Sequence, residues 1–179
     1  GSTELSDFPT TPGAYDISYN GGDFWGGDAF VSKLNGDLTI LLASTYLGGL
    51  SGDYGRSLSI DPDGSIYVTG TTQSSDFPTT AGAYDTSFHV GIVDAFVSKL
   101  SGDLTGLLAS TILGGIDPDT ATCLAIDSSG SVFVVGYTEH DNWSSRGGLQ
   151  DFPITPGAYD TSFNDIDDFS ITIVSDAFV

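Results

Sequence analysis

The stretch DAFVSKLNGDLTILLASTYLGG, Asp28 to Gly49, returns as DAFVSKLSGDLTGLLASTILGG, Asp94 to Gly115, at an offset of 66 residues (94 − 28). The same offset relates IDPDGSIYVTG, which begins at Ile60, to IDSSGSVFVVG, which begins at Ile126. Near-identity at a fixed period is the sequence signature of a repeat architecture. The fold therefore has to be predicted from one module that is present twice.

Each module contains four short runs in which apolar and polar residues alternate, which is the pattern of half-buried strands. In the first copy these runs are DAFVSKL, LTILLASTYL, SLSID and SIYVTGTT, and turns containing Gly or Asp separate them as in hairpins. We therefore expect an all-β fold of tandem four-stranded antiparallel sheets. The expected core consists of the repeated apolar residues Phe30, Leu42, Leu58, Ile60, Ile66 and Val68 and their partners 66 residues later: Phe96, Leu108, Leu124, Ile126, Val132 and Val134.

A segment with closely spaced Pro and Gly joins the modules. DFPTTPGAYD at Asp7 recurs as DFPTTAGAYD at Asp76 and as DFPITPGAYD at Asp151. Its composition excludes a helix or a central strand. We expect a rigid connector whose aromatic side chains pack against the sheets: Phe8, Phe77, Phe152, Tyr15, Tyr84 and Tyr159. The segments that follow it differ in length, which is typical of surface loops.

These blocks divide the chain into four parts. Residues 1–27 hold the tail of a preceding repeat with its connector, and residues 28–93 a first complete repeat. Residues 94–175 hold a second complete repeat with a loop insertion, and residues 176–179 the first strand of a following repeat. The first and last parts are incomplete repeats, so we expect the chain to be a piece of a longer array.

The blocks YLGG, IDPDGSIYVTG, SDFPTT and DAFVSKL, in that order from Tyr46 to Leu100, resemble the bacterial β-propeller repeat often called SBBP, of the seven-bladed type. The resemblance implies four-stranded antiparallel blades, a secreted or cell-surface location and a scaffold role with no catalytic residue to carry over. Propellers usually close with 4–8 blades, and two complete modules are too few. Either the array continues or several chains assemble.

The charge of the chain excludes some partners. Its formal net charge is −20, from 24 acidic and 4 basic residues. Nucleic-acid binding requires clustered cations, so it is not expected, and anionic membrane surfaces are disfavoured for the same reason. No stretch approaches the roughly 18 consecutive apolar residues of a membrane span, so no membrane insertion is expected. The one cysteine cannot form an intramolecular disulfide.

Some carboxylates are candidate calcium ligands. Asp61 and Asp63 form a DPDG turn, and Asp117 and Asp119 form DPD. Alternating Asp can supply the oxygen ligands that Ca²⁺ favours, although neither stretch completes a calcium-binding loop. The alternative is that Asp simply favours turns, where it accepts bonds from nearby N–H groups. No cofactor is required by the sequence, but calcium could stabilise an array of this charge.

Other candidate sites are few. Asn142 begins the sequon Asn-Trp-Ser on the insertion and is a candidate glycosylation site. Cys123 replaces Ser57 of the other copy, which favours a small packed side chain, and His89 and His140 have no equivalents. No pattern indicates a catalytic centre, so an enzyme is not expected.

The leading hypothesis is an extracellular or cell-surface structural protein that self-associates into a filament or array through strand pairing and blade packing. The alternative is an adhesin or carbohydrate-binding propeller that contacts surface glycans through its variable loops and the insertion from His140 to Gly147. A third hypothesis is a hydrolase whose site lies on further blades.

Overall fold

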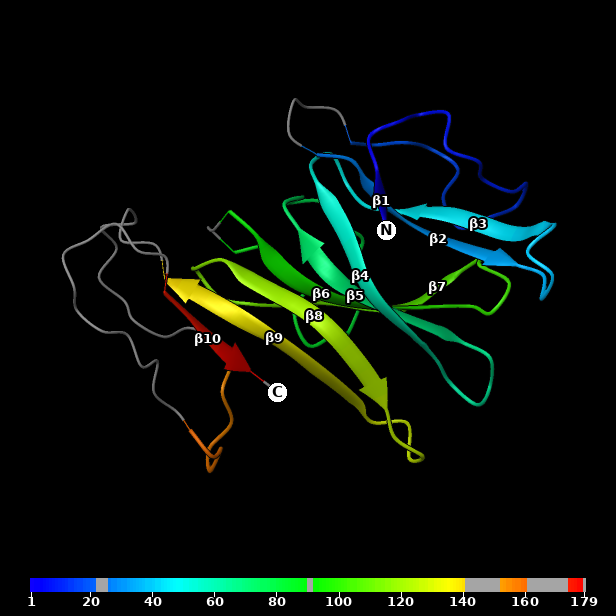
Figure 1. Ribbon diagram of the computed structural model, residues 1–179. Coiled ribbons are helices and arrows are strands. Elements are labelled where there is room, and N and C mark those ends of the chain that lie inside the picture. The colour runs from blue at the N-terminus through cyan, green and yellow to red at the C-terminus, as the bar shows by residue number, and fades with distance from the viewer. Residues whose placement is uncertain (22–25, 90–91, 141–151, 161–173, 179) are drawn as a thin grey trace.

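The computed structural model describes residues 1–21, 26–89, 92–140, 152–160 and 174–178 (Figure 1). Among these residues the regular elements are all strands, and no helix occurs. The predicted all-β fold is confirmed. In the same part of the chain no helix is long and apolar enough to cross a membrane.

The strands of the described residues form three antiparallel sheets, named A, B and C in chain order. Sheet A has the order β1 (Ser2–Thr3), β2 (Asp28–Leu34), β3 (Leu41–Leu47). Sheet B has the order β4 (Asp53–Ile60), β5 (Ile66–Thr72), β6 (Asp94–Leu100), β7 (Leu107–Leu113). Sheet C has the order β10 (Val174–Phe178), β9 (Val132–His140), β8 (Asp119–Ile126). His140 was expected in the loop insertion, but it is the last residue of β9.

Sheet B shows the complete unit, and sheets A and C show parts of it. Thr72 pairs with Asp94 between β5 and β6, Thr3 pairs with Asp28 between β1 and β2, and Thr138 pairs with Asp176 between β9 and β10. Sheet A thus holds the second, third and fourth strands of the unit, and sheet C the first, second and third. The four-stranded sheet is confirmed, and it runs across the boundary drawn at residues 93 and 94. The expected first strand of a following repeat, residues 176–179, falls largely within β10, which pairs with β9 of its own chain.

The first strands of sheets B and C lie side by side (Figure 1). Ser57 on β4 and Cys123 on β8, which are equivalent positions, approach each other with Oγ and Sγ 3.7 Å apart. Cys123 is exposed, so its expected role as a small packed side chain is wrong. Sheets B and C therefore meet in part through their first strands, as blades do around an axis.

The connectors cover the outer edges of sheets A and B. The Thr11 N–H donates to the Ser44 carbonyl at 3.0 Å and the Tyr46 N–H to the Asp16 carbonyl at 3.0 Å, along β3. Along β7 the same two bonds recur one repeat later, from Thr80 to Ser110 at 3.1 Å and from Ile112 to Asp85 at 3.0 Å. These backbone groups of the two edge strands are therefore satisfied within the chain.

The aromatic residues of the connector divide into two groups. The Phe8 and Phe30 ring centroids are 4.1 Å apart, and the Phe77 and Phe96 centroids 4.5 Å apart, so these phenylalanines pack on the sheets as expected. Tyr15 packs against the core, whereas Tyr84 is 73% exposed. Tyr159 is exposed as well, so the expectation is wrong for the last two tyrosines.

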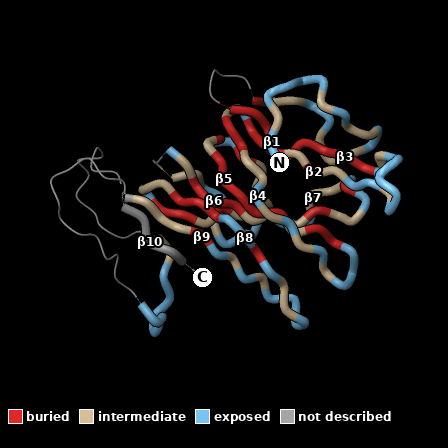
Figure 2. The backbone as a smooth tube through the Cα atoms, viewed as in Figure 1, coloured by how far each residue is buried: buried red, intermediate tan, exposed pale blue. Residues whose placement is uncertain are grey.

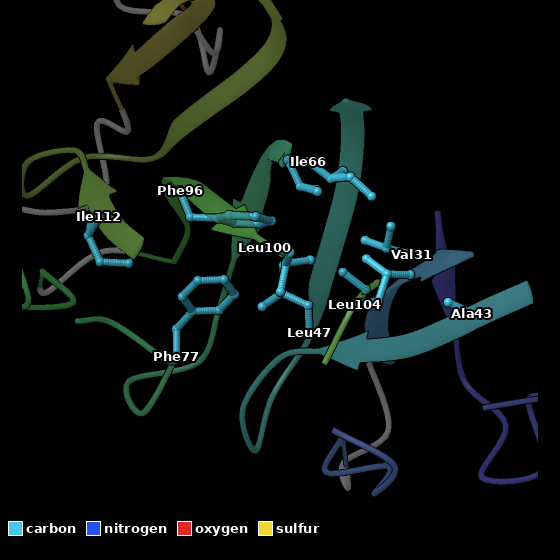
Figure 3. Packing of buried hydrophobic residues seen from close by; sticks show 11 residues of the cluster. Val31, Ala43, Leu47, Ile66, Phe77, Phe96, Leu100, Leu104 and Ile112 are labelled. Atoms are coloured by element: carbon cyan, nitrogen blue, oxygen red, sulfur yellow. The ribbon is translucent and has the colours of Figure 1, made fainter. Parts of the chain in front are cut away.

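The hydrophobic core lies between sheets A and B (Figure 3). Sheet A contributes Ala29, Val31, Ala43 and Leu47, and sheet B with its connector and turn contributes Ile66, Val68, Phe77, Phe96, Leu100, Leu104 and Ile112. Most residues of β5 and β6 are buried, whereas most residues of the turns at the ends of the sheets are exposed or half-buried (Figure 2). The core is therefore an interface between sheets.

The predicted core is correct only in part. Ile66, Val68, Phe96 and Leu124 are buried, but Leu42, Leu108, Leu58 and Ile60 are exposed. Leu124 is covered because β8 contacts β4, β5 and β6. Its equivalent Leu58 lies on β4, which contacts sheet A through β2 and the two-residue β1, and it stays 54% exposed.

Candidate functional site

The interface between sheets A and B is built around a leucine in the turn Ser101–Gly106, here called turn B. Leu104 has a φ of 60°, which is uncommon for a bulky side chain because the left-handed region crowds its Cβ. The Leu104 N–H donates to the Ser101 carbonyl at 2.8 Å, and the Gly106 N–H donates to Ser101 Oγ at 3.0 Å. The turn is therefore formed by bonds within itself.

Leu104 fills a groove on sheet A, here called groove A and defined by Tyr15, Val31, Lys33 and Ala43. Leu104 is fully buried beside Val31 and Ala43, which are 4% and 6% exposed (Figure 3). The Tyr15 N–H donates to the Leu104 carbonyl at 2.8 Å. Lys33 Nζ donates to the carbonyl of Gly102 in the same turn at 3.0 Å. One sheet thus holds the turn of the next by apolar contact and by two hydrogen bonds.

The equivalent groove on sheet B is open. It is defined by Tyr84, Val97, Lys99 and Ala109, is here called groove B, and belongs to a cavity of about 370 Å³. Ala109 is exposed and Val97 is only half-buried, unlike their counterparts in groove A. Lys99 Nζ lies 3.5 Å from a carboxylate oxygen of Asp61. The apolar floor of this groove has no turn above it in the described part of the chain.

The equivalent turn on sheet A is exposed. This turn, Asn35–Ile40, is here called turn A, and its Leu38 has a φ of 58° and is 75% exposed. The Leu38 N–H donates to the Asn35 carbonyl at 3.0 Å, and the Ile40 N–H donates to Asn35 Oδ1 at 2.9 Å. A leucine held in an unfavourable backbone conformation at the surface is an outlier that motivates a functional hypothesis.

Two buried aspartates meet where sheets A and B begin. Asp28 starts β2 and accepts bonds from the N–H groups of Asn20 and Gly21, each at 2.8 Å. Asp53 starts β4 and accepts bonds from the Gly49 N–H at 2.7 Å and from Ser74 Oγ at 2.8 Å. Burial raises the pKa of Asp28, and it raises the pKa of Asp53 to about 6 despite these bonds. The packing of sheet A against sheet B at this end therefore depends on whether these two carboxyl groups are protonated.

A second pair occupies the same place between sheets B and C. Asp94 starts β6 and accepts a bond from the His89 N–H at 2.8 Å, and Asp119 starts β8 and accepts one from the Gly115 N–H at 2.7 Å. Burial raises the pKa of Asp94 to about 6. A Cβ on Gly114 would lie 2.7 Å from Asp119 Oδ2 and 3.0 Å from Asp94 Oδ1, so the approach of the two carboxylates requires glycine there.

The four predicted calcium ligands do not gather in one place. Asp61 and Asp63 lie in the β4–β5 turn, where Lys99 Nζ is 3.5 and 3.6 Å from their carboxylate oxygens. Asp119 lies in the interface between sheets B and C, and Asp117 is half-buried just before β8. Across the described ranges no group of three or more His, Cys, Asp or Glu side chains could hold a metal ion. Calcium binding stays a prediction, and the candidate glycosylation site Asn142 lies outside the described residues.

Sequence reasoning missed the turn leucines and the interface aspartates. Both signals were available, since Gly-Asp-Leu-Thr occurs in both turns and Asp precedes Ala-Phe-Val at both β2 and β6. Neither signal indicates by itself that the residues lie between sheets.

Comparison with known proteins supports the repeat assignment. Residues 44–78 match the SBBP family, described as a beta-propeller repeat. The matched span runs from β3 through β4 and β5 into the second connector. The match confirms the resemblance of the repeat to this family. No curated protein gives a match to the sequence.

Proposed function

We propose that this β-repeat protein is a non-enzymatic structural component of the cell exterior, which assembles with copies of itself into a fibre or array by packing blade against blade. The extracellular location is supported by the secreted and cell-surface setting of the repeat family that the chain resembles. The charge of −20 is compatible with a role that involves neither nucleic acid nor an anionic membrane.

One observation carries the proposal. The molecule displays the two halves of its own internal interface: groove B is open, and turn A is exposed on sheet A. The same two parts are joined within the chain, where Leu104 fills groove A. A surface that repeats both halves of a satisfied contact is suited to packing against a further unit of the same repeat.

The carbohydrate-binding alternative depends on the variable loops. Residues 22–25, 90–91, 141–151 and 161–173 of those loops lie outside the described residues. Binding of surface glycans stays a prediction, as does the requirement for calcium.

Mass measured against concentration tests the proposal. Light scattering and sedimentation velocity of the 179-residue chain should show reversible growth beyond the monomer, and negative-stain images should show rings or filaments. Association should strengthen between about 0.05 M and about 0.5 M NaCl, because salt screens the repulsion between acidic copies. Addition of Ca²⁺ should act in the same direction.

A chain that stays monomeric at every concentration and salt would contradict the proposal. Glycan binding by that monomer on an array would favour the adhesin instead. Hydrolysis of a plain glycan or peptide would revive the hydrolase.

A further inference from the structure

We propose that His89 is a pH-sensitive latch at the interface between sheets B and C, which holds the second connector to the start of β6 when its imidazole is protonated and loosens when the imidazole is neutral. The latch lies within one chain, so this inference goes beyond the proposed function and does not depend on assembly. The first connector supplies a matched comparison, because Asn20 occupies the equivalent position (89 − 20 = 69), the offset that also relates Asp85 to Asp16.

In the first connector, Asn20 links two carboxylates through hydrogen bonds that carry no charge on the asparagine. Its Nδ2 donates to Asp16 Oδ2 at 2.9 Å, and its backbone N–H donates to Asp28 Oδ2 at 2.8 Å. The other oxygen of Asp28 accepts a bond from the Gly21 N–H at 2.8 Å. An amide neither gains nor loses a proton in this pH range, so the asparagine side chain donates in acid and in alkaline solution alike.

His89 lies between the equivalent carboxylates but contacts them differently. Its backbone N–H donates to Asp94 Oδ2 at 2.8 Å, as the Asn20 N–H does to Asp28. Its ring atoms Nε2 and Nδ1 lie 3.4 Å from Asp85 Oδ2 and 3.5 Å from Asp94 Oδ2. Nδ1 is buried and makes no hydrogen bond with the described residues. A neutral imidazole has one N–H and can serve one carboxylate, whereas the protonated ring has two and can pair with both.

Asp94 has more need of a positive partner than its counterpart Asp28. It is fully buried, and its Oδ1 accepts no hydrogen bond from the described part of the chain. That oxygen faces Asp119 of sheet C, since a Cβ on Gly114 would lie 3.0 Å from it and 2.7 Å from Asp119 Oδ2. Burial raises the pKa of Asp94 to about 6, and the bond from the His89 N–H and the nearby imidazole oppose that rise. A charge on the imidazole therefore stabilises a carboxylate that is otherwise poorly compensated.

The ionisable groups around the latch are acidic on each described element that packs there. They come from the connector itself, from the start of β6, from β8 with the segment before it, and from the end of β9, where an N–H donates to the Pro118 carbonyl of that segment at 2.8 Å. In this order they are Asp85, Asp94, Asp119 with Asp117, and Glu139. Protonated His89 pairs with the first two, so the stability from these pairs is present in acid and is lost as the pH rises through the range of about 5 to 8 in which imidazoles titrate.

Backbone bonds on both sides of the latch should report its state. On the outer side, the Ile112 N–H of β7 donates to the Asp85 carbonyl at 3.0 Å. On the inner side, the Asp119 N–H of β8 donates to the Val93 carbonyl at 2.8 Å. The segment between these two bonds contains His89, so a loosened latch should expose both N–H groups to solvent more often.

Hydrogen exchange of single amides, followed by NMR in a dilute chain, tests the latch. The reporters are Ile112 and Asp119, and the control amides are Tyr46 and Asp53, which make the equivalent bonds to Asp16 and Gly27 in the first repeat. Buried carboxyl groups make both interfaces respond to pH, so the measured quantity is the difference between wild type and His89→Asn. From about pH 5.5 to about pH 8, protection of the reporters should fall roughly three- to tenfold more in wild type than in the variant. Protection of the controls should fall equally in both.

The reciprocal variant provides a second measurement. Asn20→His should transfer the additional pH dependence to the Tyr46 and Asp53 amides. His140→Asn accounts for the other imidazole of the chain and should alter the pH dependence of the reporters less than twofold. Equal losses of protection with pH in wild type and His89→Asn would overturn the latch. A difference between them that has the same size at every pH would overturn it too, because it would show that His89 has only a packing role.

Discussion

Turn A and turn B share the residues Gly-Asp-Leu-Thr and nearly the same backbone, yet they lie in opposite environments. Leu38 is 75% exposed with a φ of 58°, and Leu104 is fully buried with a φ of 60°. The comparison separates two causes that usually act together. Local sequence sets the conformation of the turn, whereas the neighbouring sheet sets its burial.

The local cause is visible in the first residue of each turn. Asn35 accepts bonds from the N–H groups of Thr39 and Ile40 through Oδ1, each at 2.9 Å. Ser101 accepts from Thr105 at 3.1 Å and Gly106 at 3.0 Å through Oγ. Different side chains thus fix the same turn, and the leucine is in place before anything covers it.

Truncation of the two leucines should give the largest difference between the turns. Leu104→Ala should lower the free energy of unfolding by about 2–5 kcal/mol, because it leaves a cavity in the core. Leu38→Ala should change it by less than about 0.5 kcal/mol in the isolated chain, since the side chain contacts mainly solvent. Urea unfolding at dilute concentration measures both. Equal losses at the two positions would show that burial does not distinguish the turns.

The paired aspartates at the sheet interfaces should make the stability of the folded chain depend on pH. Burial raises the pKa of Asp53 and of Asp94 to about 6 in the folded state, against about 3.9 when unfolded. The folded chain therefore holds more protons than the unfolded chain between about pH 4 and pH 6, and the stability that these groups contribute is lost as pH rises through that window. Each contribution is on the order of 2–3 kcal/mol at most.

Amide variants isolate this effect. Asp53→Asn and Asp94→Asn should lose stability relative to wild type at pH 4 and recover most of that loss by pH 8, because the amide carries no charge that must be buried. Thermal unfolding scanned from pH 4 to pH 8 gives the difference, with Asp37→Asn, at an exposed turn position, as the control. A variant-minus-wild-type difference that is flat with pH would contradict the raised pKa values.

Glycine at the two turns should give the smallest effect. Because glycine adopts a positive φ without strain, each Gly variant should be more stable than the Ala variant at the same position, by about 0.5 kcal/mol after the greater entropy of unfolded glycine is included. Leu38→Gly and Leu104→Gly, each compared with its Ala variant, measure this by urea unfolding. A Gly advantage at only one position would mean that the turns do not share a backbone in solution.

The fold was predictable where local pattern decides it. The alternation in DAFVSKL and the turn residues that follow it predict strands and hairpins, and the connector motif predicts a rigid link. The grouping of strands was not predictable, because a 66-residue period says nothing about where a sheet begins. Leu58 and Leu124 occupy equivalent positions of the repeat, but one is 54% exposed and the other 6%. Their environments depend on which sheet lies opposite.

The candidate site was hidden for the same reason. Asp28 and Asp94 are the first residues of strands, where an aspartate in the sequence suggests the end of a turn, and their burial arises only where two sheets meet. Asp61 and Asp63 do lie in a turn, as the alternative to calcium predicted, and they face Lys99. Charge and spacing could not distinguish these two kinds of aspartate.

The connectors along β3 and β7 reduce a risk of misfolding that is common to proteins built of near-identical β-units. Neighbouring copies of one sequence in a single polypeptide readily misfold together, and exposed edge strands can seed amyloid. Here the segment that bonds to each outer edge belongs to the same unit as that edge. Newly made units can therefore lie close together without pairing along these edges.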